Sequence, residues 1–324
     1  MTRVAVLDDW QGIARTSADW SALEARAEVV FFAQPFRSEE EAARKLADFE
    51  ILLSMRERTP FPASLIERLP RLRMIGITGL QNRTLDLAAC TARKIVVSNT
   101  VGHGRHRDAT AELALGLMLA AARSIPAADA NMRSGRFQEG LPAGMSMCGK
   151  TVGIIGLGKL GTQMARYCRA LGMNLLAWSP NLTAERAEAE GGTLVSKQEL
   201  LSRSDVVSIH VVLSARSRGM IGAVDLALMK PGAILVNTSR GPLVDEAALV
   251  AALESGRILA GLDVYDEEPL PAEHPLRRAP NTVLTPHLGY GVQETWEEYY
   301  PQSVENALAF LDGRPVRVVN PEVL

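Results

Sequence analysis

Three side chains in the second half of the chain are of the types that proton and hydride chemistry needs. Arg240, Glu268 and His287 each come shortly after an apolar run that is predicted to be a buried strand. The carboxyl ends of parallel strands meet at one edge of a sheet, where ligands bind in open α/β folds. We therefore expect one cation, one carboxylate and one imidazole to converge there. The three runs are Ala233–Val236, Leu259–Leu262 and Thr282–Leu284.

This set of groups suits the interconversion of a 2-oxo acid and a 2-hydroxy acid. Reduction needs a hydride delivered to carbon and a proton delivered to oxygen, and histidine is the side chain best matched to moving a proton near neutral pH. Glu268 beside His287 would favour the protonated imidazole. Arg240 has the fork geometry to bind a substrate carboxylate and polarise the carbonyl. Taken singly, each residue also has a structural interpretation. His287 could be a hydrogen-bonded structural histidine, Glu268 a solvated surface acid and Arg240 a partner in an interdomain salt bridge.

A glycine motif adds a dinucleotide to this chemistry. Gly156, Gly158 and Gly161 form G-x-G-x-x-G between an apolar strand predicted over 152–155 and a helix predicted over 159–171. The first glycine allows a tight turn, the second lets the backbone approach a pyrophosphate, and the third lets the helix pack close on the strand. The helix N-terminus offers unpaired N–H groups to the anion. A nicotinamide bound there would supply the hydride.

Strands and helices alternate along the chain, which predicts parallel sheets with helices on both faces. Two βα arrays follow one another, separated by a long apolar helix over 108–123. Residues 125–150 show little periodicity, and we interpret them as an arm or loop. Strands are predicted at 4–7, 29–32, 51–53, 74–77, 95–97, 152–155, 174–178, 193–195, 206–210, 233–236, 259–262 and 282–284. The other helices are predicted at 21–27, 39–46, 62–69, 85–93, 159–171, 183–190, 197–203, 225–229, 246–254 and 293–311.

The bulk composition limits the class of protein. The 324 residues suffice for about two domains of roughly 150 residues each. A net charge of −2 gives no basic surface for nucleic acid or an anionic membrane, and no apolar run approaches the ~20 residues of a membrane span. The N-terminus lacks the apolar core of a signal peptide. Cys90, Cys148 and Cys168 have no metal-ligand or disulfide spacing, so we expect a cytoplasmic protein without a metal.

Five segments carry a resemblance that covers essentially the whole chain. They are Gly156–Gly161, Ser204–His210, Met229–Gly241, Asp263–Leu270 and Thr285–Gly289. Together they resemble the D-isomer-specific 2-hydroxyacid dehydrogenases, the family that contains phosphoglycerate dehydrogenase, glycerate dehydrogenase and glyoxylate/hydroxypyruvate reductase. The resemblance implies two doubly wound parallel-sheet domains, with a Rossmann NAD(P)-binding domain inserted in a flavodoxin-like substrate domain. It places the substrate domain at 1–100 plus 290–324 and the NAD(P)-binding domain at 101–289, with a homodimer formed through an arm near 125–150.

The resemblance also implies roles for individual residues. Arg240, Glu268 and His287 match the catalytic residues of the family, and Arg240 and His287 also contact the substrate. Asp263 matches an aspartate that contacts the nicotinamide amide. The positions expected to bind the cofactor are Thr110, Gly156, Gly158, Lys159, Leu160, Gly161, Ser179, Ser214, Thr238, Ser239, Asp263 and Gly289.

The substrate side is the least family-like part of the chain. Arg56 and Gly79 fall where the first domain of the family meets substrate, although Arg56 could equally belong to a charged surface loop. The segment His103–Asp108 replaces a small neutral loop of the family. It is either a solvated interdomain loop, which we favour, or an anion clamp over the substrate. Val212 stands where a proline is usual, with little consequence.

Ser179 leaves the choice of cofactor open. It ends the second predicted strand of the nucleotide-binding domain, where an acid would accept hydrogen bonds from a ribose 2′-hydroxyl and repel a 2′-phosphate. Serine does neither strongly, and Arg186 lies only a helical turn or so later. We expect NAD, with NADP possible.

Two classes of function fit these observations. The first is an NAD(P)-dependent dehydrogenase of a small D-2-hydroxy acid, acting on a CH–OH group with a small-molecule partner only. The second is a dinucleotide-sensing binding protein of the corepressor type, which shares the fold. A nucleotide-binding methyltransferase does not explain Arg240, Glu268 and His287, and formate dehydrogenases carry an amide at the position of Glu268. The sequence does not name the 2-hydroxy acid.

Overall fold

The computed structural model divides the chain into two compact units. It describes residues 1–102 and 108–324, so most of the segment His103–Asp108 lies outside the described residues. The first unit combines residues 1–102 with 292–324, and the second holds 108–291. Each unit has its own parallel sheet, and the predicted fold class is confirmed.

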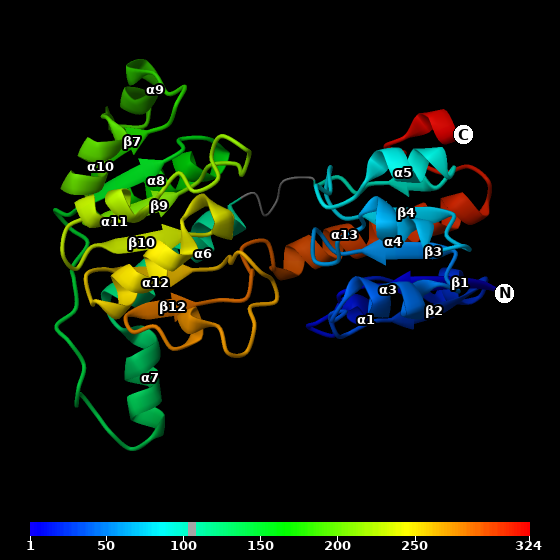
Figure 1. Ribbon diagram of the computed structural model, residues 1–324, viewed down its shortest axis with the longest axis horizontal. Coiled ribbons are helices and arrows are strands. Elements are labelled where there is room, and N and C mark those ends of the chain that lie inside the picture. Colours follow the sequence, from blue (N-terminus) through cyan, green and yellow to red (C-terminus); the bar gives the residue numbers. More distant parts are fainter. Residues whose placement is uncertain (103–107) are drawn as a thin grey trace. The chain divides into compact units, whose positions relative to one another are not determined.

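The first unit is a five-stranded parallel sheet in the order β2-β1-β3-β4-β5, the doubly wound order of flavodoxin-like folds. Helix α13 packs with α1, α2 and β4, whereas α3, α4 and α5 pack along one another (Figure 1). The strands are β1 (Thr2–Val6), β2 (Ala27–Phe31), β3 (Ile51–Ser54), β4 (Met74–Ile77) and β5 (Val96–Ser98). The helices are α1 (Ala14–Ser17), α2 (Ser21–Glu24), α3 (Glu39–Leu46), α4 (Ala63–Glu67), α5 (Leu87–Ala92), α13 (Gln293–Leu311) and the 3₁₀ turn η3 (Pro321–Val323).

The second unit is a seven-stranded parallel sheet in the order β12-β11-β10-β9-β6-β7-β8. Counted from its own first strand this is the Rossmann order 3-2-1-4-5-6 with one strand added. The strands are β6 (Thr151–Ile155), β7 (Asn174–Trp178), β8 (Thr193–Leu194), β9 (Val206–Ile209), β10 (Ile234–Asn237), β11 (Leu259–Leu262) and β12 (Thr282–Leu284). The helices are α6 (Ala109–Ala122), α7 (Ile125–Arg133), α8 (Lys159–Ala170), α9 (Ala184–Ala189), α10 (Lys197–Arg203), α11 (Ala223–Leu228), α12 (Glu246–Glu254) and the 3₁₀ turns η1 (Gly241–Leu243) and η2 (Pro275–Arg277).

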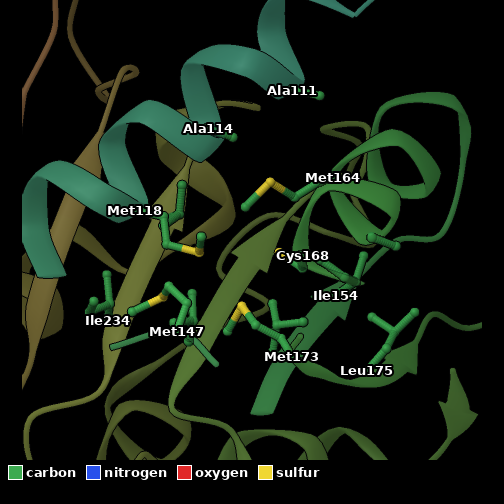
Figure 2. Packing of buried hydrophobic residues seen from close by; sticks show 14 of the residues in the cluster. Ala111, Ala114, Met118, Met147, Ile154, Met164, Cys168, Met173, Leu175 and Ile234 are labelled. Carbon is green, nitrogen blue, oxygen red and sulfur yellow. The ribbon is translucent and has the colours of Figure 1, made fainter. Parts of the chain in front are cut away.

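The strands are short apolar runs because helices cover both faces of the sheet, so neither face can be polar. Two clusters of buried residues lie in the second unit. Figure 2 shows one of them, where side chains of α6, α8, β6, β7 and β10 converge. Four of its side chains are the buried methionines Met118, Met147, Met164 and Met173, whose flexible thioethers fill irregular gaps.

Helix α6 packs directly on the sheet at a glycine. A Cβ on Gly261 of β11 would lie 2.8 Å from the Cβ of Leu117, so only glycine allows this close approach. Half of the residues in α6 are buried, which agrees with its nearly continuous apolar sequence. This packing brings the start of α6 to the loop after β12.

The prediction of an arm or loop over 125–150 is wrong for its first part. Residues Ile125–Arg133 form helix α7, with Pro126 in the first turn, a favoured site for proline. The buried side chain of Asn131 donates to the carbonyl of Glu139 at 2.8 Å and ties the following segment to the helix. Because this buried residue is polar, the helix lacks the apolar stripe by which periodicity is recognised.

No single helix among the described residues is long and apolar enough to span a membrane. Only taken together are helices α6 and α7 long and apolar enough for a span, and the two helices meet at a bend of 64°.

Candidate active site

The turn after β6 has the geometry that its three glycines predict. Gly156 has a φ of +97°, and a Cβ there would lie 2.7 Å from the carbonyl oxygen of His210. A Cβ on Gly161 would lie 2.0 Å from the carbonyl oxygen of Gly156, so this glycine lets α8 pack on the turn. Neither position accommodates a side chain without rearrangement.

Gly158 differs from the other two glycines. It is the N-cap residue of α8, and apart from its chain neighbours and the backbone of α8 no heavy atom of the described residues lies within 4 Å of a Cβ placed there. The open space stands at the helix N-terminus, where the N–H groups of Lys159 and Leu160 begin the helix. A pyrophosphate fits this cradle, because backbone donors and the positive end of the helix dipole face the same space.

His287 and Glu268 form a hydrogen-bonded pair. The imidazole Nδ1 lies 2.5 Å from the Glu268 Oε2, and both side chains are about a third exposed, at 28% and 30%. The other carboxylate oxygen, Oε1, accepts a hydrogen bond from the Tyr265 N–H at 2.9 Å. A carboxylate on Nδ1 favours the tautomer that carries its proton there, which leaves Nε2 to exchange a proton with a ligand.

The loop that carries His287 is held by the buried Asp263. The Asp263 carboxylate accepts hydrogen bonds from the Leu288 N–H at 2.7 Å, the Gly289 N–H at 2.8 Å and the Thr285 hydroxyl at 2.6 Å. Its side chain has no exposed surface, and burial raises its pKa. A carboxylate has about four acceptor positions, and these three donors occupy most of them.

Arg240 stands at the end of β10, next to the strands that carry Glu268 and His287. Because β10, β11 and β12 are neighbours in the sheet, their loops leave the same edge. The Arg240 Nη1 donates to the Ser239 carbonyl at 2.7 Å, and Asn237 Nδ2 donates to the Arg240 carbonyl at 2.9 Å. The structure thus brings these three predicted residues to one sheet edge.

The remaining expected cofactor residues lie at the same edge or beside it. The Thr110 hydroxyl donates to the Gly289 carbonyl at 2.8 Å, which joins α6 to the His287 loop. The Thr238 Oγ1 is buried and has no hydrogen-bond partner among residues 1–102 and 108–324, so a ligand could satisfy it. The Ser239 hydroxyl is occupied, since it donates to the Ile209 carbonyl at 2.8 Å. Ser214 is exposed, and its N–H donates to the Ser217 hydroxyl.

Ser179 follows β7 directly, beside the glycine turn. Arg186, on α9, points its Nη2 to the carbonyl of Leu157 at 3.4 Å. Leu157 lies between the first two glycines, so this guanidinium lies beside the expected pyrophosphate cradle.

Arg56 and Gly79 are in the first unit, at the carboxyl ends of β3 and β4. The Arg56 Nη1 donates to the Thr78 carbonyl at 3.2 Å and lies over Gly79, where a Cβ would be 1.9 Å away from it. Both residues have positive φ, at +52° and +83°. The structure therefore brings Arg56 and Gly79 together.

Two residues near the site, the buried Tyr265 and the half-buried His210, were not predicted to take part. Tyr265 contacts the loops of all three catalytic candidates and is described below. His210 follows β9, where its Nε2 shares a hydrogen bond of 2.8 Å with the Ser208 hydroxyl. Burial lowers the pKa of His210 to about 4, so it is neutral near pH 7. Their positions at strand ends were the only available signal.

No group of three or more histidine, cysteine, aspartate or glutamate side chains in the described ranges could hold a metal ion.

The glycine turn, the Rossmann strand order and the three strand-end loops define a dinucleotide-binding α/β protein. Residues 115–289 match the model of the D-isomer specific 2-hydroxyacid dehydrogenase NAD-binding domain. The chain belongs to this family, as the sequence predicted.

Similar proteins agree with this assignment. A glyoxylate reductase of Thermococcus litoralis is 40% identical over 80% of each chain. A D-3-phosphoglycerate dehydrogenase of Archaeoglobus fulgidus is 39% identical over 86% of this chain and 53% of its own length. The chain therefore spans about half the length of the first phosphoglycerate dehydrogenases that it matches. The crystal structure of a phosphoglycerate oxidoreductase from Vibrio cholerae superposes with a TM-score of 0.89 at 33% identity, covering 97% of this chain and 100% of that one.

Proposed function

We propose that the protein is a nicotinamide-dependent dehydrogenase that interconverts a small 2-oxo acid and its D-2-hydroxy acid. The observation that carries the proposal is the pair between His287 Nδ1 and Glu268 Oε2, 2.5 Å apart, at the sheet edge that also holds Arg240. A binding protein has no need of an imidazole whose second nitrogen is left available for proton exchange.

In reduction, His287 gives a proton from Nε2 to the oxygen of the carbonyl group. Glu268 stabilises the imidazolium from which that proton leaves and orients the ring through Nδ1. Arg240 binds the substrate carboxylate and polarises the carbonyl, because its guanidinium matches a planar anion. The nicotinamide cofactor, when bound, supplies the hydride. In oxidation His287 accepts the proton of the hydroxyl group instead.

The cofactor residues that we assign are those around the glycine turn, together with Thr110, Thr238 and Asp263. Their support is the open cradle at Gly158 and the Thr238 hydroxyl, which has no hydrogen-bond partner within the described part of the chain. We propose NAD as the cofactor and treat NADP as the alternative, since Ser179 lacks the charge that would repel a 2′-phosphate and Arg186 lies near the turn.

The relatives suggest the substrates to test. Two groups of them are named for glyoxylate reduction and for phosphoglycerate oxidation. A panel of glyoxylate, hydroxypyruvate, pyruvate and phosphohydroxypyruvate, each assayed with NADH and with NADPH, would identify both the 2-oxo acid and the cofactor. Dinucleotide binding without turnover of any member would favour the dinucleotide-sensing alternative.

The decisive variant is His287→Ala. We expect it to lower kcat at least about a hundredfold, in the range that general acid–base catalysis contributes, and to leave the dinucleotide Kd within about twofold. His274→Ala is the matched control, because His274 also pairs with a glutamate, Glu246 Oε1 at 3.0 Å. We expect this control to keep its kcat. Equal kcat values for wild type and His287→Ala would contradict the assigned role.

We further propose a homodimer formed through the arm after α6, in the cytoplasm, with no nucleic-acid or membrane partner. Three large apolar side chains of this segment are exposed, Ile125 at 52%, Met132 at 59% and Phe137 at 65%. Exposed apolar side chains grouped in one segment are typical of an interface.

A further inference from the structure

We propose that Tyr265 is a positioning residue that holds the loops of Arg240, Glu268 and His287 in one arrangement. This inference rests on the proposed dehydrogenase function for its meaning, but its contacts are independent of any substrate. Tyr265 lies three positions after Leu262, the last residue of β11 (Leu259–Leu262).

The first contact is with the His287 loop. The Tyr265 hydroxyl donates to the Thr285 carbonyl at 3.0 Å and lies 3.3 Å from the Leu262 carbonyl. The His287 N–H is shared between this Thr285 carbonyl, at 3.1 Å, and the Asp263 carbonyl, at 2.9 Å. The hydroxyl therefore holds one of the two acceptors against which the histidine backbone is placed.

The second contact is with the carboxylate of Glu268. The Tyr265 N–H donates to Oε1 at 2.9 Å, and the other oxygen, Oε2, meets His287. A carboxylate bound at one oxygen by a backbone donor cannot rotate freely. Tyr265 thus directs the remaining oxygen at the imidazole.

The third contact is with the Arg240 loop. A Cβ on Gly241 would lie 2.1 Å from the Tyr265 carbonyl carbon, so the backbones of these two loops touch. Tyr265 is 7% exposed and belongs to the buried cluster on this side of the sheet. The loop that carries Arg240 therefore rests on a residue that is anchored in the core.

Burial keeps the hydroxyl in its donating form. It raises the pKa of Tyr265 above the usual tyrosine value, and the nearby Asp263 and Glu268 raise it further. A protonated hydroxyl remains a donor to the Thr285 carbonyl at all ordinary pH values. Small displacements of catalytic groups reduce rate strongly, so this one hydrogen bond has a measurable effect on turnover.

The test compares Tyr265→Phe with Tyr167→Phe. Tyr265→Phe keeps the buried ring and removes only the hydroxyl, whereas Tyr167, on α8 of the same unit, lies outside the assigned site. The first readout is the proton NMR resonance of the His287 Nδ1–H, which is assigned by its loss in His287→Ala. The second readout is functional and consists of kcat, KM and the dinucleotide Kd. The resonance needs no substrate, so it reports on positioning even if no 2-oxo acid is reduced.

We expect Tyr265→Phe to shift or broaden the Nδ1–H resonance and to lower kcat about three- to tenfold, the effect of one hydrogen bond, with KM and Kd within about twofold. Tyr167→Phe leaves both readouts unchanged. An unaltered resonance and kcat in a folded Tyr265→Phe protein would overturn the positioning role. A shifted resonance in an enzyme without activity on the panel would retain it and overturn the proposed function instead.

Discussion

His287 has a backbone conformation that few side-chain-bearing residues adopt. Its φ of +54° lies in the left-handed region, at a cost of about 1–3 kcal/mol. The surrounding loop compensates, because the His287 N–H donates to the Asp263 carbonyl at 2.9 Å and the Asp263 carboxylate accepts the next two backbone N–H groups. Asp263 therefore stabilises the local fold around His287, whatever contact it also makes with a nicotinamide.

Asp8 is a second strained residue, at the end of β1 in the other unit. It has a φ of +61°, and its side chain is 1% exposed. Its Oδ1 accepts the Thr59 hydroxyl at 2.9 Å, whereas Oδ2 is buried without a hydrogen-bond partner in the described part of the chain. Burial raises the pKa of Asp8 from 3.8 to about 6. The folded protein thus binds this proton more tightly than the unfolded chain does.

This raised pKa predicts the direction of a pH effect on stability. The stabilising contribution of the Asp8 proton is fully present below the unfolded pKa of 3.8 and is lost as the pH rises through about 6. Asp8→Asn carries no charge at any pH. We therefore expect the variant to be more stable than wild type at pH 8, by about 1–3 kcal/mol, and the difference to shrink at pH 5. Urea unfolding at the two pH values measures this.

Asp48→Asn serves as the control for Asp8→Asn. The Asp48 side chain is 71% exposed and lies 3.8 Å from Arg3. An exposed pair of this kind contributes little, so its replacement should change stability by less than about 1 kcal/mol at both pH values. If the free energy of unfolding differs between Asp8→Asn and wild type by the same amount at pH 5 and at pH 8, the raised pKa of Asp8 would be contradicted.

At the scale of elements, the strands were the most predictable part of the fold. Parallel strands covered on both faces are predominantly apolar, and β3, β4, β9 and β10 are buried throughout. This is why residues at strand ends could be proposed as a site. Helix α7 was missed because its buried residue is Asn131, whose partner is a backbone carbonyl in the following loop. Local patterns do not contain such a contact.

The same limit applies to the candidate site. The types and positions of Arg240, Glu268 and His287 were visible in the sequence because each follows a strand. Tyr265 was not identified, because its contacts join loops from three strands that are separated along the chain. A residue whose role is to connect segments becomes apparent only when their spatial order is known.

The glycines of the turn between β6 and α8 have two different roles, one in packing and one in dinucleotide binding. Gly161→Ala places a Cβ 2.0 Å from the Gly156 carbonyl oxygen, so we expect it to destabilise the protein by about 1–3 kcal/mol. In Gly158→Ala the new methyl group meets no described residue within 4 Å beyond its chain neighbours and the backbone of α8, and the φ of −91° is allowed. It should keep its Tm within about 2 °C and weaken dinucleotide binding at least about tenfold, because the methyl group occupies the pyrophosphate space.

Thermal unfolding and fluorescence titration with NADH and NADPH measure the two effects separately. Each variant is the control for the other, since both change a glycine of one motif to alanine. Undiminished dinucleotide affinity in Gly158→Ala would exclude the space at the N-terminus of α8 as the pyrophosphate site.

At the scale of the whole molecule, long-range contacts explain why the first unit is built from both ends of the chain. The C-terminal segment belongs to the first unit, where Asn306 Nδ2 donates to the Asn99 carbonyl at 2.8 Å and Asn320 Oδ1 accepts the Val97 N–H at 2.8 Å. Arg26 pairs with Asp312 at 2.8 Å. These contacts join residues more than 200 positions apart, and a local sequence pattern does not contain them. The alternation of strands and helices therefore predicted two arrays in series. Only the family resemblance implied that one domain is inserted in the other.

The proposed dimer gives a prediction at this scale. Phe137, 65% exposed, lies just beyond α7, and its replacement by glutamate would put a charge in the proposed interface. We expect Phe137→Glu to weaken self-association at least about a hundredfold, because it removes roughly 1.5–3 kcal/mol of apolar burial and adds a desolvated carboxylate. Val224 on α11 is 78% exposed and lies outside the arm, so Val224→Glu is the matched control and should remain dimeric. Sedimentation equilibrium measures both variants. A wild-type monomer, or equal dissociation of the two variants, would show that the arm does not form the interface.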